Sequence, residues 1–358
     1  MWFEANCRTT AMGIMPHTSI DRALKLALSL DVPFFPQLPK VSLYEDMYVQ
    51  ASEHFPGIVL DAANERLTFS NVRFEEELGA YSDLMEDPQR LALSPQYSPA
   101  FYRLLEQDLG GYAAIRGQII GPVSFGFKVV DEDSRPLIYN DSARTVLFDF
   151  MQRKANAQYR QLKAKNPNAF VWMDEPGLGW VFSGLSGYND LQAKSDYNDF
   201  LVGIEGPKGL HLCANVNLPY LLSMGLDILS FDAYALEVMP SGYVRDVAAF
   251  LDAGGIICWG IVPTDSTSLN AETPAGLMAR LVGYWEKVAG ETGIGLGTIA
   301  RQALIAPARC CLKNTGQVDA EATQDCPLPG STEERLVEKA FDYLRELSLS
   351  LRNRYVEA

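Results

Sequence analysis

The sequence predicts an α/β fold, a (β/α)8 or TIM barrel, because short apolar segments alternate with longer amphipathic ones along its 358 residues. The short segments are mostly apolar without strict alternation, as expected of parallel strands covered on both faces. No stretch rich in Pro, Gly or Ser divides the chain, so we expect a single domain over residues 1–358. The eight expected strands are 8–14, 32–38, 117–123, 170–176, 210–216, 227–234, 256–262 and 303–308.

The expected helices have apolar positions at steps of three and four residues. One begins at a Ser19 cap, and another opens with a cap at Asp141 or Ser142. The last helix starts with a capping box of Ser331 and Glu334. Its apolar stripe consists of Leu336, Val337, Ala340, Phe341, Leu344, Leu347 and Leu351.

An insertion of approximately residues 56–113 separates the second and third expected strands. Residues 57–70, GIVLDAANERLTFS, read as a hairpin within it, because two apolar runs flank a polar turn. We expect helices to follow this hairpin.

Composition excludes several classes of protein. The chain is 47% hydrophobic and 21% charged, which is typical of a globular domain, and its formal charge of −15 disfavours nucleic acid and anionic membranes as partners. The N-terminus lacks the pattern of a signal peptide, and no apolar run reaches the roughly 18 residues of a membrane span. Six cysteines in a chain this long indicate reduced thiols and a cytoplasmic location.

Residues suited to chemistry collect where the expected strands end. In a TIM barrel the active site lies at the carboxyl ends of the strands. We therefore expect a site there. Following the strands in chain order, these residues are Ile14 and His17, Gln37, Ser124, Asp174 and Glu175, His211 and Cys213, Asp232, and Cys310 and Cys311.

His211 and Cys213 are the strongest candidates for a metal site. Residues two apart in a strand point to the same face, so both could ligate one ion. Imidazole and thiolate suit zinc, and Asp232 and Cys310 from other strands could complete the shell. The alternative is that His211 is a hydrogen-bonded core histidine and Cys213 a small buried hydrophobe.

Five segments carry a resemblance to a known family: TTAMGIMPHT (9–18), GPVS (121–124), VWMDEPGL (171–178), HLCANV (211–216) and CCLK (310–313). In their order and their places on the strands they resemble the catalytic barrel of cobalamin-independent methionine synthase. That family belongs to a broader group with uroporphyrinogen decarboxylase and the corrinoid-dependent methyltransferases. With one barrel, the chain is similar to the shorter core forms.

The resemblance implies a zinc-dependent methyltransferase acting on a thiol. The implied ligands are His211, Cys213, Asp232 and Cys310, with Cys311 as the alternate to Cys310. Asp174 would hold the amino group of the substrate, with Glu175 beside it. The implied catalytic residues are His17, Asp174 and Glu175, and the implied substrate-binding residues are Ile14, Gln37, Ser124 and Asp174.

Several residues depart from the family pattern. Asp232 stands where methionine synthases have Glu, and Glu237 is a less favoured substitute. Ile14 replaces a Ser that helps hold homocysteine, and His17 replaces a Gln. The acceptor is therefore homocysteine or another small thiol. His17 either contacts a different acid group or caps the helix that follows.

Other interpretations stay open. The Asp-Glu pair before Pro176 can serve only to cap the following segment. The length of the chain, similar to that of the core forms, implies a methyl-corrinoid protein as donor. A metal-free decarboxylase like uroporphyrinogen decarboxylase is the runner-up, although it needs several Arg around a polycarboxylate. A barrel that binds a methyl-corrinoid partner without catalysis is the third.

Overall fold

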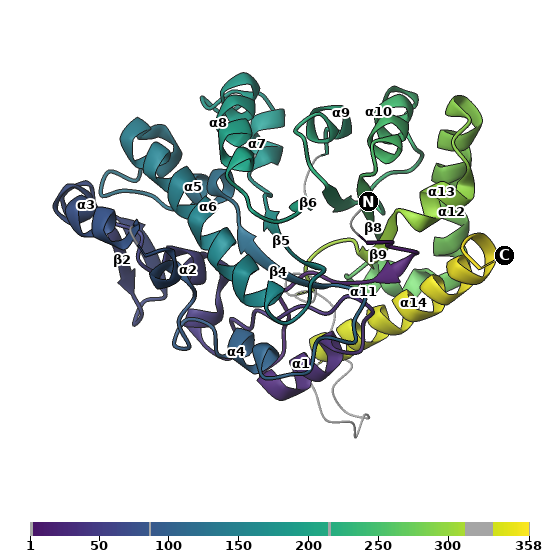
Figure 1. The fold of residues 1–358 in the computed structure, drawn as a ribbon, viewed down its shortest axis with the longest axis horizontal. Coiled ribbons are helices and arrows are strands. Elements are labelled where there is room, and N and C mark those ends of the chain that lie inside the picture. Colours follow the sequence, from purple (N-terminus) through teal and green to yellow (C-terminus); the bar gives the residue numbers. More distant parts are fainter. Residues whose placement is uncertain (1–2, 86, 214–215, 312–331, 358) are drawn as a thin grey trace.

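The computed structural model describes residues 3–85, 87–213, 216–311 and 332–357. Its centre is a curled, parallel sheet of seven strands in the order β1-β9-β8-β7-β6-β5-β4, surrounded by helices (Figure 1). This arrangement is consistent with the predicted TIM-barrel class. The strands are β1 Arg8–Thr9, β4 Ile115–Ile120, β5 Ala169–Asp174, β6 Lys208–Leu212, β7 Ile228–Asp232, β8 Ile256–Val262 and β9 Ala303–Pro307.

The second predicted strand, 32–38, is not a strand of this sheet, so a full eight-stranded barrel is not confirmed. Pro33 and Pro36 have no N–H to donate, which interrupts a regular ladder. The segment nevertheless contacts both edges of the sheet. One of its N–H groups donates to the Thr9 carbonyl (2.9 Å), and the Arg116 N–H donates to the Pro33 carbonyl (2.9 Å).

The insertion contains the predicted hairpin and helices. Strands β2 Ile58–Asp61 and β3 Arg66–Phe69 pair antiparallel. The Phe69 N–H donates to the Val130 carbonyl (2.9 Å), which fastens the hairpin just after α5 Pro122–Lys128. The other elements before β4 are η1 Leu43–Glu45, α2 Met47–Ser52, α3 Asn71–Met85, η2 Pro88–Leu91 and α4 Pro99–Leu105.

The remaining helices cover the outside of the sheet (Figure 1). They are α1 Ile20–Ala27, η3 Leu137–Tyr139, α6 Asp141–Lys163, α7 Leu178–Phe182, α8 Asp190–Val202, α9 Leu218–Leu222, α10 Ser241–Asp252, α11 Ser266–Ala271, α12 Pro274–Thr292, α13 Leu296–Arg301 and α14 Thr332–Tyr355. Within the described ranges, no helix combines the length and the apolar character needed to cross a bilayer.

The predicted caps have different outcomes. Ser19 caps α1 as predicted, since its side chain accepts the Arg22 N–H. The predicted cap of α6 is wrong by one residue: Asn140 has an extended backbone and its side chain accepts the Ala143 N–H (3.1 Å), whereas Asp141 is already helical. Ser331 lies outside the described residues.

Helix α14 lies beside α1, as the yellow and purple ribbons of Figure 1 show. Glu334 accepts the Thr18 N–H (3.1 Å) and pairs with Arg22 (2.8 Å). The predicted stripe of α14 is buried from Val337 to Leu351, with Leu336 partly buried. Packing of this stripe thus joins the two ends of the chain.

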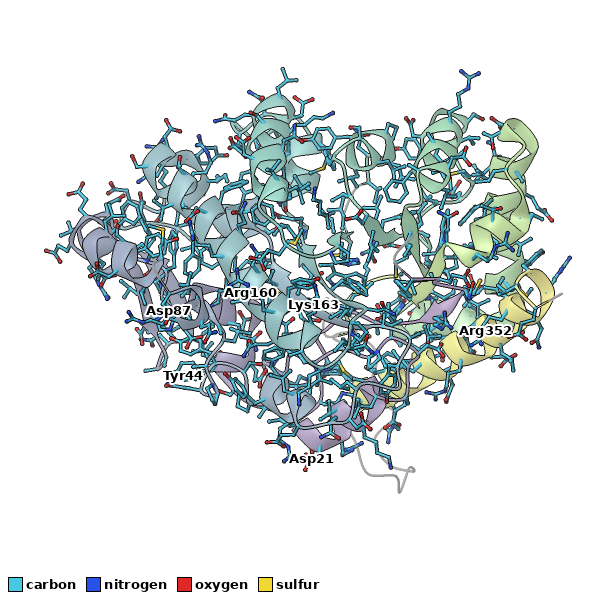
Figure 2. The ribbon with its side chains drawn as sticks, in the orientation of Figure 1. Asp21, Tyr44, Asp87, Arg160, Lys163 and Arg352 are labelled. Carbon is cyan, nitrogen blue, oxygen red and sulfur yellow. The ribbon has the colours of Figure 1, made fainter. Side chains whose placement is uncertain are left out.

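Charged side chains lie on the outer helices, as Asp21 on α1, Arg160 on α6 and Arg352 on α14 illustrate (Figure 2). Asp21 accepts from Arg103 of α4 (2.9 Å), and Arg352 approaches Asp31 (3.8 Å). These ion pairs are at the surface, where each contributes at most about 1 kcal/mol.

Candidate functional site

A cavity of about 790 Å³ lies at the carboxyl ends of the strands. Ile14, Asp174, His211, Cys213 and Cys310 line it, so the fold brings together these residues from four separated parts of the chain. The insertion also contributes, because residues 65–68 of its hairpin form part of the wall, and residues 46–49 around the start of α2 line it as well. This volume is typical of a small-molecule site.

His211 has one satisfied ring nitrogen and one unsatisfied. It lies on β6 and is buried, its Nδ1 is 2.9 Å from the Ser230 hydroxyl, and its ring stacks on Trp172 with centroids 5.7 Å apart. Its Nε2 is buried and has no hydrogen-bond partner among the described residues. Burial, helped by the charge of Arg116, lowers the pKa of His211 to about 3. The imidazole is therefore neutral, the form that binds metals.

Two thiols face the same cavity as His211. Cys213 follows β6, Cys310 follows β9, and neither is in a disulfide. Burial, reinforced by Cys310 and Asp174, raises the pKa of Cys213 to about 12. In the absence of a metal ion this thiol is thus protonated at neutral pH.

The structure distinguishes the two adjacent cysteines after β9. Cys310 lines the cavity, whereas Cys311 is buried in the apolar core and its N–H donates to the Ile14 carbonyl (3.4 Å). Burial raises the pKa of the Cys311 thiol. This placement favours Cys310 as the residue that meets a ligand.

The side chains of His211, Cys213 and Cys310 are of the types that bind zinc, although the three are not placed so as to share a metal ion. An unpaired imidazole nitrogen and two thiols are ligands that zinc prefers. Over the ranges that the structure describes, no three His, Cys, Asp or Glu side chains are placed so as to hold a metal ion. Binding by His211, Cys213 and Cys310 therefore requires these side chains to move toward one another.

Asp232, the fourth predicted ligand, has other partners. It is the last residue of β7 and is buried. Its Oδ2 accepts from Arg309 Nε at 2.6 Å, and its Oδ1 accepts the Ala235 N–H at 2.9 Å. The sequence analysis did not identify Arg309, although it directly precedes Cys310 and lines the cavity.

Glu175 belongs to a completed hydrogen-bond network. Its carboxylate accepts the N–H groups of Val123 (3.0 Å) and Ser124 (2.8 Å) and the hydroxyls of Ser124 and Tyr197. It thus caps α5 and not the segment after Pro176. Burial raises the pKa of Glu175 to about 7, and these hydrogen bonds oppose that rise.

The two motifs GPVS and DEPG hold each other in place. Ser124 Oγ, which donates to Glu175, also accepts the Gly177 N–H (2.8 Å). A Cβ on Gly121 would lie 2.1 Å from the Glu175 carboxylate, so this position requires glycine. Neither Ser124 nor Glu175 lines the cavity.

Asp174 is the last residue of β5 and, unlike Glu175, faces the cavity. Burial raises its pKa to about 7, and Glu175 adds to the rise while Arg116 opposes it. A cationic group bound beside Asp174 would favour the ionised carboxylate. The position suits the predicted contact with an amino group.

Two further predicted site residues, Gln37 and His17, also lie away from the cavity wall. Gln37 is buried, and its Nε2 donates to Gln50 (2.7 Å). His17 is buried, and burial lowers its pKa against the opposing effect of Glu334. Since Ser19 caps α1, the interpretation of His17 as the cap is wrong.

Arg116 is a second residue that the sequence analysis missed. It lies on β4 with no exposed surface, its guanidinium is 3.7 Å from the centre of the Trp172 ring, and its Nη2 has no hydrogen-bond partner in the described part of the chain. A single charged residue within an apolar strand would have marked Arg116 as a candidate site residue. The predicted strand, however, began at Gly117, the residue after Arg116.

Two solved structures resemble the whole chain. A B12-independent methionine synthase from Shewanella sp. W3-18-1, in complex with selenomethionine, superposes with a TM-score of 0.57 at 12% identity, covering 98% of this chain and 99% of that one. A methyltransferase from Methanosarcina mazei gives 0.55 at 16% identity, covering 97% and 94%. The chain has the fold of these two proteins. At such identities the likeness establishes the fold alone. No protein-family model and no curated protein matches the chain.

Proposed function

We propose that this protein is a zinc-dependent methyltransferase that methylates the sulfur of a small thiol. The observation that carries the proposal is the buried, unpaired Nε2 of His211 in a cavity shared with Cys213 and Cys310. The fold likeness to a methionine synthase and to a methyltransferase supports the same type of reaction.

In this proposal His211, Cys213 and Cys310 would hold the ion. Because Asp232 is engaged by Arg309 and Ala235, we assign three protein ligands and leave the fourth position to the substrate sulfur. A bound zinc ion lowers the pKa of a coordinated thiol, so that its sulfur is a thiolate at neutral pH.

The cavity residues would orient the thiol. Asp174 accepts a cationic amino group, and Ile14 supplies apolar wall. Glu175 and Ser124 act indirectly, since their network fixes the end of β5. Residues 32–38, although they do not form a regular strand, would close the barrel between β1 and β4. His17 and Gln37 receive no substrate contact, because neither lines the cavity.

We propose that the methyl donor is a methyl-corrinoid protein, as the resemblance to the family implies. The acceptor sulfur bonds to the methyl carbon as the bond from that carbon to the donor breaks, and the thiol proton is released. Cys213 and Cys310 must stay reduced, which agrees with the cytoplasmic location expected from the sequence.

Zinc content tests the proposal directly. Protein purified without added metal should contain about one zinc by elemental analysis, or take up one on titration. X-ray absorption at the zinc edge should then show one added sulfur neighbour when homocysteine or another accepted thiol is present. Less than half an equivalent of zinc, with no uptake on titration, would contradict it.

Turnover can be measured with methylcobalamin as a small corrinoid donor. The absorbance of methylcobalamin should fall only when thiol and zinc-loaded protein are both present, and a methyl thioether should appear by mass spectrometry. Protein treated with a chelator is the matched control. Equal rates with and without the chelator treatment would contradict the role of the metal.

A further inference from the structure

Arg309 occupies a distinctive place in the cavity. It lies between the end of β9 and Cys310, and it lines the same cavity as Cys213, Cys310 and Asp174. Its side chain is 54% exposed, so its guanidinium is open to an incoming molecule. Arg309 is thus close to the point where the substrate sulfur would bind.

Asp232 binds the Arg309 guanidinium through its Nε–H group. Arg309 Nε donates to Asp232 Oδ2 at 2.6 Å, and the carboxylate itself is 3% exposed. The other oxygen accepts the Ala235 N–H, so Asp232 cannot turn without losing a second bond. A buried carboxylate bonded at both oxygens is a rigid anchor.

Among the residues that the structure describes, the two Nη groups of Arg309 make no hydrogen bond. A guanidinium has five N–H groups in a plane, and the contact with Asp232 uses the one on Nε. In the described residues, Asp232 is the sole carboxylate within ion-pair distance of Arg309. Two Nη groups side by side match the paired oxygens of a carboxylate or a sulfonate.

We propose that Arg309 is a specificity-determining residue that binds an anionic group of the thiol substrate, a carboxylate or a sulfonate, while Asp232 holds its guanidinium in place. The inference rests on the proposed function, because it takes the substrate to be a thiol bound at Cys213 and Cys310. It assigns Asp232 to positioning of Arg309 and not to the metal.

The other charged residues of the cavity wall differ from Arg309 in sign or in position. Acidic side chains at Asp46, Glu65 and Asp174 also line the wall and repel an anion. Two further cations, Arg66 and Lys128, belong to the hairpin side and to the end of α5. Arg66 is exposed and, within the structure as described, forms no ion pair. It is therefore a matched control: a cation on the cavity wall whose guanidinium is not held by a buried carboxylate.

Calorimetric binding of three thiols tests the inference. The probes are 3-mercaptopropionate, 2-mercaptoethanesulfonate and the neutral 3-mercapto-1-propanol. We expect the wild type to bind at least one of the two anionic thiols about tenfold or more tightly than the neutral one. The anionic thiol that binds more tightly distinguishes carboxylate from sulfonate recognition.

Variants then test which residue causes the preference for anionic over neutral thiols. Arg309→Gln should bind the anionic and neutral thiols equally, with unchanged zinc content, and Arg309→Lys should keep part of the preference. Arg66→Gln should behave as wild type. Asp232→Asn should weaken the preference but keep one zinc, because Asp232 positions Arg309.

Four results would overturn the inference. They are an unchanged preference in Arg309→Gln, loss of the preference in Arg66→Gln, loss of zinc in Asp232→Asn, and no binding of any of the three thiols to the wild type. The zinc content of the wild type reports separately on the proposed function. A protein without zinc that still prefers the anionic thiols through Arg309 would reject the methyltransferase proposal and retain the anion site.

Discussion

Two groups of residues at the strand ends, the Glu175 network and the group of His211, Cys213 and Cys310, differ in how completely their polar atoms are bonded. On the β4–β5 side, the Glu175 carboxylate accepts four hydrogen bonds. On the β6–β9 side, His211 Nε2 has no partner in the described residues, and Cys213 and Cys310 face the cavity. An unsatisfied buried polar atom costs about 1–3 kcal/mol, so it is expected where a ligand supplies the missing partner. We call the Glu175 network the scaffold side, and the group of His211, Cys213 and Cys310 the binding side.

The largest expected effect comes from breaking the binding side. Cys310→Ser should reduce zinc from about one equivalent to less than about 0.1 and abolish methyl transfer, because a hydroxyl replaces a thiolate ligand. Elemental analysis and the methylcobalamin assay measure the two quantities.

Cys311→Ser is the matched control for that change. Cys311 is adjacent but buried in the core, so its replacement should lower stability by about 1–3 kcal/mol and leave the zinc content of the folded protein near one. Loss of zinc from Cys311→Ser, with retention in Cys310→Ser, would reverse our assignment of the two cysteines.

The next largest effect comes from breaking the scaffold side. Gly121→Ala would place a Cβ 2.1 Å from a Glu175 carboxylate that four donors hold in place. We expect the free energy of unfolding to fall by about 3 kcal/mol, as for overpacking combined with a broken buried network. Urea unfolding followed by circular dichroism measures the change.

Gly283→Ala provides a comparison for the glycine substitution. Gly283 lies in α12 with open space around its Cβ position, so alanine should raise stability by about 0.5–1 kcal/mol through helix propensity. If Gly121→Ala is as stable as the wild type, the GPVS and DEPG motifs are not locked together as described.

A smaller effect on stability, which depends on pH, is expected at Glu45. Like Glu175, Glu45 is a buried carboxylate that accepts hydrogen bonds. It accepts the Ala100 N–H (2.8 Å) and Gln50 Nε2 (3.0 Å), and burial raises its pKa to about 7. Because the folded state binds this proton more tightly than the unfolded chain, the stabilisation is complete below about pH 4.3 and is lost as pH rises through about 7.

The loss at Glu45 should amount to about 2–3 kcal/mol between pH 4.5 and 7.5. Glu45→Gln should show a flatter dependence of the unfolding free energy on pH in that range. Urea titrations at half-unit pH steps compare the two proteins. Identical slopes would show that Glu45 does not titrate with a raised pKa.

The sequence analysis succeeded where local rules decide the structure. It predicted the α/β class, the hairpin of the insertion and the apolar stripe of α14, each of which depends on short-range periodicity. Its one failed strand, 32–38, contains two prolines that remove ladder donors. Its α6 cap was one residue off, because Asn140 and Asp141 are both good capping residues.

The candidate site was predicted in part. Ile14, Asp174, His211, Cys213 and Cys310 line one cavity, as their places at the strand ends led us to expect. Gln37 and Ser124 bond to other partners and His17 is buried away from the cavity wall, since the end of a strand does not determine the direction of a side chain. Arg116 was missed because the predicted strand began at Gly117, two residues after the start of β4.

The sequence by itself determined the alternation of strands and helices, because each has its own apolar periodicity. It also determined the common face of His211 and Cys213, because residues two apart in a strand point the same way. Only the tertiary structure decided that Glu175 caps α5 and that Arg309 engages Asp232, across a separation of 77 residues in the chain. Such pairings depend on how separate strands curl around one centre, and no local pattern records that geometry.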